Sequence, residues 1–198
     1  MDRDTELQLV ERLRAGDPGA FDAIYESLNA PLFTFLLRLS RRRDVAEDLL
    51  EETWLRLVKH ATRLRPDTRI APWLFTVARH LHVSYVRSRV LEDSAAASLM
   101  SLWPFSPLNS ARPSPFEATA ANELHRRIER ALASMPATSR EVLLLVAVGG
   151  LDHSDAADVC GITPEALRQR LSRARALLAR SLDDEAPSTA RVLSEVAP

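Results

Sequence analysis

Apolar residues recur at intervals of three and four along most of this chain, and this spacing constrains its fold more than any other feature. Phe21, Ile24, Tyr25 and Leu28 show the pattern clearly, because residues so spaced share one face of an α-helix. Sustained alternation of valine, isoleucine or threonine, which marks β-strands, is not found. Only five glycines occur among 198 residues. The sequence therefore predicts an all-α fold.

A segment rich in proline and serine interrupts this pattern at residues 91–116. Prolines at this density prevent a continuous helix, so we expect a flexible linker there. We expect small helical domains on either side, at residues 5–90 and 117–182, and an acidic tail at 183–198. The four prolines of the linker are Pro104, Pro107, Pro113 and Pro115.

Helix boundaries are expected at proline and glycine. In the first domain, Pro31 is expected to open a new helix, a polar loop to follow at residues 61–70, and another helix to run from Pro72 to about Val90. In the second domain, helices are expected at 117–134, 138–148, 153–160 and 164–181. The last begins Thr163-Pro164-Glu165, which combines a hydroxyl cap, a first-turn proline and an acid near the positive helix end.

Net charge and cysteine content exclude some classes of protein. The formal charge of -1 gives no whole-molecule argument for binding nucleic acid or membranes. Both domains are nonetheless mildly basic, with 15 basic against 13 acidic residues in 1–90 and 9 against 7 in 123–182. The single cysteine, Cys160, excludes an internal disulfide. Because no apolar run approaches 18 residues and the first residues are acidic, we expect a cytoplasmic protein without membrane insertion.

Residues 154–171 have the pattern of a helix-turn-helix. A short helix carries the small residue Ala157 on its inner face, and Gly161 then permits a turn with positive φ before a longer helix. Any helical hairpin in a bundle is the alternative. The basic face of the second helix favours DNA, because arginine forks match phosphate oxygens and guanine edges and an α-helix fits the major groove. Its arginines are Arg168, Arg170, Arg173, Arg175 and Arg180, against the one acid Glu165.

The sequence contains no recognisable catalytic or metal-binding pattern. His80 and His82 are two residues apart and so point to different sides of a helix, which prevents chelation of one metal ion. Nucleotide-binding glycine loops and the nucleophile-elbow motif do not occur. Cys160 lies at an inward position of the helix-turn-helix, where a small buried hydrophobe is expected. We expect no enzyme activity, no catalytic residues, no metal and no cofactor.

These residues resemble a known family, the small extracytoplasmic-function (ECF) group of bacterial RNA polymerase sigma factors, within the sigma-70 family. The resemblance covers both domains in the right order, with a linker and no region-three domain between them. The segments 132–136, 140–145 and 167–178 look like region four of that family, and 46–54 and 72–79 look like its region two. The family's fold is a region-two bundle and a region-four helix-turn-helix.

The resemblance implies contacts with core RNA polymerase. In the family, an acidic helix of region two docks on a coiled coil of the largest catalytic subunit, and the flap region of the second-largest subunit is a further partner. The matching positions here are Asp48, Leu49, Glu51, Glu52 and Trp54. From spacing alone, a solvated face beside a core tryptophan is the alternative.

The resemblance also implies two contacts with promoter DNA and an anti-sigma partner. Region two would recognise and melt the minus-ten element through Arg69, Trp73, Arg79, His80, Tyr85 and Arg87, with core positions as the alternative for Trp73 and Tyr85. Region four would bind the minus-thirty-five element through Thr163, Glu165, Ala166, Arg168, Gln169, Arg170, Arg173 and Arg175. Departures from the family pattern occur at Glu51, His80 and Ser84, where glutamine, asparagine and aspartate are common. We expect the change at His80 to affect which flipped base of the minus-ten element is accepted.

The expected function is therefore that of an alternative sigma factor, which directs promoter-specific transcription initiation and is controlled by an anti-sigma factor. Two other functions compete with it. A sigma-like decoy would sequester an anti-sigma factor without binding DNA, but would have no need of the arginine face. A stand-alone helix-turn-helix regulator would leave the region-two motifs unexplained.

Overall fold

The structure is a computed structural model that describes residues 3–100 and 120–184. Over these residues it contains helices and no strand, which confirms the all-α prediction. In chain order the elements are α1 (Arg3–Arg14), α2 (Pro18–Ser40), α3 (Arg43–His60), the 3-10 turn η1 (Ala61–Arg63), α4 (Ile70–Met100), α5 (Ala120–Ser134), α6 (Ala137–Ala147), α7 (His153–Cys160) and α8 (Pro164–Asp184). We call α1–α4 the first module and α5–α8 the second module.

Helix α2 lies at the centre of the first module and contacts α1, α3 and α4. It begins at Pro18, where the Asp17 carboxylate accepts a hydrogen bond from Gly19 N and Pro18 occupies the first turn. The expectation that Pro31 opens a new helix is wrong, since Pro31 lies inside α2. Leu28 and Leu32 on either side of it are buried, so tertiary packing holds the helix together across the missing N–H.

Helix α4 begins earlier and ends later than expected. Its N-terminus lies at Ile70 rather than Pro72, where Glu6 of α1 accepts hydrogen bonds from Ile70 N at 2.8 Å and Ala71 N at 3.3 Å. It continues to Met100, past the expected end near Val90, so its last turns fall within the segment expected to be a linker. The four linker prolines and most of the acidic tail lie outside the described residues.

The second module has the expected helices within a few residues, including the helix-turn-helix of α7 and α8. Asp152 caps α7 by accepting a hydrogen bond from Asp155 N at 2.8 Å. Gly161 then ends α7 with a φ of 65°, a conformation that favours glycine. The Thr163 hydroxyl accepts from Ala166 N at 3.2 Å, which confirms the predicted cap of α8. Ala157 is fully buried where the two helices approach each other.

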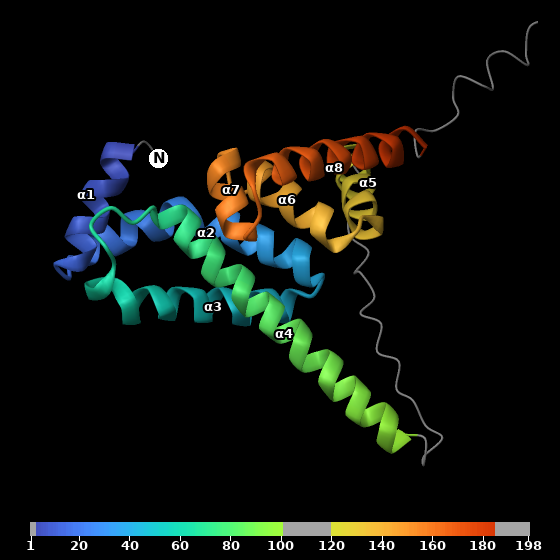
Figure 1. The fold of residues 1–198 in the computed structure, drawn as a ribbon, viewed down its shortest axis with the longest axis horizontal. Helices are drawn as coiled ribbons and strands as arrows, with labels where there is room; N and C mark the ends of the chain where they lie inside the picture. The colour runs from blue at the N-terminus through green and yellow to red at the C-terminus, as the bar shows by residue number, and fades with distance from the viewer. Residues whose placement is uncertain (1–2, 101–119, 185–198) are drawn as a thin grey trace, which may run out of the picture.

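The two modules pack against each other, an arrangement that the expectation of two tethered domains did not include. Helix α4 contacts α7, and α2 contacts α5 and α6 (Figure 1). Buried residues of both modules form one continuous apolar cluster. At one close approach, Gly149 lies so near Phe75 of α4 that an added Cβ would sit 2.9 Å from the ring. The inter-module contact therefore contains a packed apolar core.

Candidate functional site

Helix α8 presents its arginines to solvent. Its inner face is anchored by Leu167, Leu171 and Ala174, which are buried. The outer face is a shallow open groove lined by Arg168, Gln169, Ser172 and Arg173. Of the residues expected to bind the upstream element, Thr163, Glu165, Arg168, Gln169, Arg173 and Arg175 are exposed, and Ala166 and Arg170 are half-buried.

Two of these side chains are held by contacts within α8. Arg168 Nη2 lies 2.7 Å from Glu165 Oε1, and Arg173 Nε donates to Gln169 O at 3.3 Å. A hydrogen bond from its own backbone N–H and the nearby Arg168 guanidinium lower the pKa of Glu165. The carboxylate is therefore charged at neutral pH and holds the Arg168 fork on the exposed face.

The acidic face of α3 is only partly as expected. Asp48 and Glu51 are exposed, and Glu52 is half-exposed with Arg56 Nε 3.0 Å from its Oε1. Leu49 and Trp54 are instead buried in the core, 9% and 7% exposed. They can position the acidic face, but they offer little surface to a partner.

Beside these acids lies an apolar groove that sequence analysis missed. Trp54 forms its floor, with its ring centroid 4.9 Å from that of Tyr25 and its Nε1 donating to Asn29 Oδ1 at 3.0 Å. The exposed Leu55 and Val58 border it. The groove has a volume of about 350 Å³, and its lining is Phe21, Tyr25, Glu47, Leu50, Glu51, Trp54, Leu55 and Val58. A second apolar stripe on α3, at Leu50, Leu55 and Val58, was the available sequence signal.

The six residues expected to meet the downstream element do not share one environment. His80 and Arg87 on α4 are exposed, whereas Trp73 is half-buried near the His60 ring. Tyr85 is half-buried and interacts with Arg42.

Arg69 and Arg79 form ion pairs with acids of the second module, and the Arg69 side chain remains 41% exposed. Arg79 Nε lies 2.9 Å from Glu141 Oε1 of α6. Arg69 Nη1 lies 2.6 Å from Asp155 Oδ1 and 3.4 Å from Asp152 Oδ2 at the start of α7. These ion pairs join the two modules.

The module interface also perturbs the ionisation of two buried groups in opposite directions. Burial raises the pKa of Asp155 to about 6, although Arg69 acts against this rise. Burial lowers the pKa of His82, and the nearby charges of Arg140 and Arg79 lower it further. At neutral pH the interface therefore holds a neutral histidine beside two arginines.

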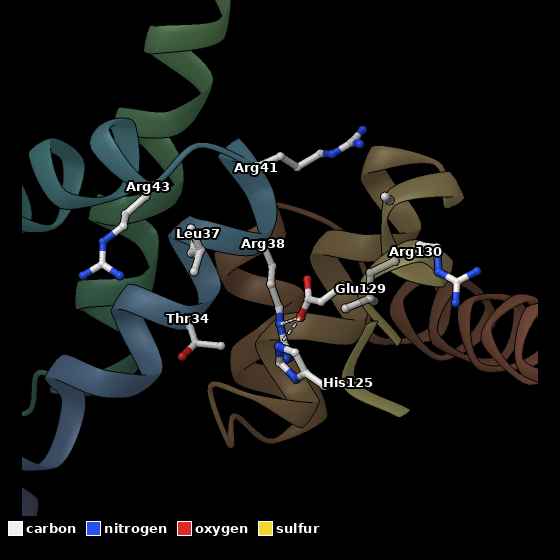
Figure 2. Close-up of a pocket in the computed structure, with 10 residues that line it drawn as sticks. Thr34, Leu37, Arg38, Arg41, Arg43, His125, Glu129 and Arg130 are labelled. Carbon is white, nitrogen blue, oxygen red and sulfur yellow. Dashed lines mark hydrogen bonds and ion pairs between the residues drawn. The ribbon is translucent and has the colours of Figure 1, made fainter. Parts of the chain in front are cut away.

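A second groove lies where α2 meets α5 (Figure 2). The Arg38–Glu129 ion pair crosses it at 2.9 Å between Nε and Oε1. Its volume is about 740 Å³, and its lining includes Leu37, Arg41, Arg43, His125, Arg130 and Leu132. The sequence contained no signal for this site, because it exists only when the modules pack together.

Cys160 is buried, and burial together with the Glu141 carboxylate raises its pKa to about 12. Its Sγ lies 3.9 Å from Glu141 Oε2. Within residues 3–100 and 120–184, no three His, Cys, Asp or Glu side chains gather in a way that could hold a metal ion. None of the helices in those ranges combines the length and hydropathy needed to cross a bilayer.

Comparison with known proteins identifies the family. Residues 24–91 match the family model "Sigma-70 region 2", and residues 125–178 match "Sigma-70, region 4". The chain is 33% identical over 155 residues to "ECF RNA polymerase sigma factor EcfG" of Rhodopseudomonas palustris, covering 76% of this chain and 78% of the relative. It is 29% identical over 168 residues to "ECF RNA polymerase sigma factor SigM" of Bacillus subtilis, covering 83% and 98%.

Solved structures agree with these matches. The sigma factor RpoE of Bartonella quintana, solved with the anti-sigma factor NepR, superposes with a TM-score of 0.64 at 26% identity, covering 83% of this chain and 99% of that one. CnrH, solved with the cytosolic domain of CnrY, has the same fold, with a TM-score of 0.68 at 21% identity over 92% and 99% of the two chains. Two helical modules that match the region 2 and region 4 models, with an exposed basic helix α8, thus define a sigma-70-type protein. The chain belongs to the ECF RNA polymerase sigma factors.

Proposed function

We propose that this chain binds core RNA polymerase and directs it to promoters, with α8 on the upstream element, α4 on the downstream element and α3 on the polymerase. The exposed guanidinium face of α8 carries this proposal. Arg168, Arg173 and Arg175 project from a helix whose opposite side is anchored in the core. Such a helix can enter the major groove of duplex DNA, where arginines contact phosphates and guanine edges.

The polymerase contact is assigned to the acidic face of α3 and the apolar groove beside it. Asp48 and Glu51 are exposed carboxylates able to meet arginines of a partner helix, while Leu55 and Val58 offer apolar surface at the same place. An apolar centre with a charged rim is the usual composition of a protein interface. Leu49 and Trp54 support this surface from inside.

The downstream contact is assigned to α4 and the loop before it. His80 and Arg87 are exposed, and aromatic or basic side chains suit single-stranded DNA because rings stack on bases and cations neutralise phosphates. Arg69 and Arg79 belong to the same proposed surface, and both pair with acids of the second module. Binding unpaired bases in preference to duplex would shift promoter DNA towards its open state.

An anti-sigma protein is the proposed inhibitor, since the sigma factor RpoE was solved with the anti-sigma factor NepR. The chain itself is proposed to have no enzymatic activity, because RNA synthesis belongs to the polymerase. This role places the chain in the cytoplasm, where transcription occurs.

Transcription in vitro with purified core polymerase tests the proposal. Promoter-dependent initiation without another specificity factor is expected. A decoy for an anti-sigma factor, or a regulator that binds DNA alone, would give none. The double variant Arg168→Ala/Arg173→Ala should lose initiation and keep polymerase binding, because both side chains lie on the exposed face of α8 and neither supports the core. Unchanged initiation by this variant would refute the assignment of α8.

A further inference from the structure

The second groove, between α2 and α5, combines apolar surface with a basic rim. Leu37 and Leu132 line its apolar part, and the ion pair between Arg38 and Glu129 crosses it. Against that single acid, four arginines line the groove: Arg38, Arg41, Arg43 and Arg130. The proposed contacts with polymerase and DNA do not use this surface. Its composition suits an occupant that is both acidic and partly apolar.

Arg41 is the most unusual residue of this rim. It ends α2 with a φ of 59°, and within residues 3–100 and 120–184 no other residue except glycine has a positive φ. Glycine is the usual residue at such a position, because an L side chain there strains the backbone. Strain of this kind occurs where a side chain has a use. Figure 2 shows Arg41 extending from the end of α2 towards the side on which α5 lies.

The rim arginines are also available to a new acidic partner. Arg41 forms no ion pair with any residue that the structure describes. Arg43 Nε lies 2.7 Å from Glu47 Oε1, and Arg130 Nη2 lies 3.2 Å from Glu123 Oε1. All four side chains of these two pairs are more than half exposed, so the pairs contribute little to stability and can exchange partners.

We propose that the acidic tail of this chain docks in the second groove through residues 185–198. Residues 183–198 hold four acids against one arginine, which complements the basic rim. Val192, Leu193 and Val196 have the spacing that places apolar side chains on one side of a helix, and Glu195 lies among them in the sequence. Residues 101–119 hold one acid and one arginine, so that segment lacks the complementary charge.

The tail begins close enough to the groove to reach it. Arg127 of α5 donates a hydrogen bond to Leu182 O, so the end of α8 lies against α5. Glu129, two residues further along α5, lines the groove. The eight residues from Asp184 to Val192 span up to about 26 Å when extended, whereas a helix with its side chains is about 10–12 Å across. The tail can therefore pass around α5 and bring Val192 to the groove.

Tethering makes even a weak contact effective. The tail meets the groove at the effective concentration set by its short connection to α8, which is in the millimolar range. Once docked, it contacts α2 and α5 together. Any other protein that binds this groove has to displace the tail first, so the tail acts as a competitor within the same chain.

The test places a nitroxide spin label on the tail of the full chain, through Ser194→Cys. The native Cys160 is buried and stays unlabelled. Docking should broaden the methyl NMR signals of Leu37 and Leu132. Signals of α1, at the opposite end of the molecule from α5 (Figure 1), should stay sharp. Salt at about 1 M, where the Debye length is about 3 Å, should reduce the broadening.

Three variants separate charge and apolar contact from folding. Arg41→Gly removes the guanidinium and suits the positive φ, so the end of α2 is preserved; the docking constant should fall by up to about fivefold. Arg63→Ala is the matched control, because Arg63 is an exposed arginine outside the groove and its loss changes net charge equally. Leu193→Ser removes apolar contact from the tail and should weaken docking by roughly tenfold.

Sharp Leu37 and Leu132 signals in the spin-labelled chain would overturn the inference. Broadening that survives both Arg41→Gly and Leu193→Ser would also overturn it. Broadening that passes from spin-labelled chains to chains without the label would show that the tail binds a second copy instead. A label at Ser106→Cys that broadens the same signals more strongly would assign the groove to the linker. The inference does not depend on the proposed function, which transcription with core polymerase decides separately.

Discussion

Glu6 provides the sharpest test of how the first module is held together. Glu6 is 5% exposed and its carboxylate accepts hydrogen bonds from Ile70 N and Ala71 N, so α1 caps the N-terminus of α4. Glu6→Gln keeps an acceptor at this place and removes the charge. The lost interaction with the helix dipole, together with weaker hydrogen bonds, should cost about 1.5 kcal/mol of the free energy of unfolding.

Glu6→Ala should cost more, about 3 kcal/mol, because it also leaves the buried Ile70 N–H without a partner. Urea denaturation followed by circular dichroism measures both changes. With an m-value of about 2 kcal/mol/M, the midpoint should fall by roughly 0.7 M for the glutamine variant and 1.5 M for the alanine variant.

The control is Glu11→Gln, an exposed position on the same helix, which should shift unfolding by less than about 0.5 kcal/mol. Equal midpoints for Glu6→Gln and Glu11→Gln would refute the capping role. A smaller loss for alanine than for glutamine would refute the argument from the unpaired N–H.

Three further predictions follow from the interface and the groove. The pKa of Asp155 is raised to about 6 from its ordinary 3.8, so its contribution to stability is present in acid and is lost as pH rises through 6. The melting temperature of the native chain, relative to that of Asp155→Asn, should therefore be higher at pH 5 than at pH 7. The reverse order would contradict this. Gly149→Ala places a Cβ 2.6 Å from Leu145 O and 2.9 Å from Phe75. It should lower the free energy of unfolding by about 1–3 kcal/mol, measured by thermal melting, and increase amide hydrogen exchange in α7. Melting and exchange equal to those of the native chain would exclude the close approach. Val58 is 58% exposed, so Val58→Asp should leave the melting temperature unchanged. The same change should weaken core polymerase binding by about tenfold in a pull-down titration. Undiminished binding would show that the groove is not part of the polymerase interface.

Much of the fold follows from local signals in the sequence. The helices of the second module agree with prediction within a few residues because capping residues and glycine mark their ends, as Gly161 does for α7 and Thr163 for α8. The error at Pro31 shows where local signals fail. Burial of the neighbouring leucines outweighs the lost hydrogen bond, and that burial depends on helices distant in sequence.

The candidate sites were predictable where a single helix carries them. The exposed arginines of α8 and the exposed acids of α3 follow from residue type and helical spacing. The ion pairs of Arg69 and Arg79 could not be predicted in this way, because Asp155 is 86 residues from Arg69 and Glu141 is 62 residues from Arg79. Charge counts cannot indicate which distant acid faces which arginine.

The single cysteine has a practical consequence for experiments on this chain. Burial of Sγ raises the pKa of Cys160 to about 12, so its side chain is a thiol rather than a thiolate at pH 7. Maleimide reagents react with thiolates, so we expect them to leave Cys160 unmodified. Reporter dyes can therefore be attached through cysteines introduced on the solvent side of either module, with the native residue left in place.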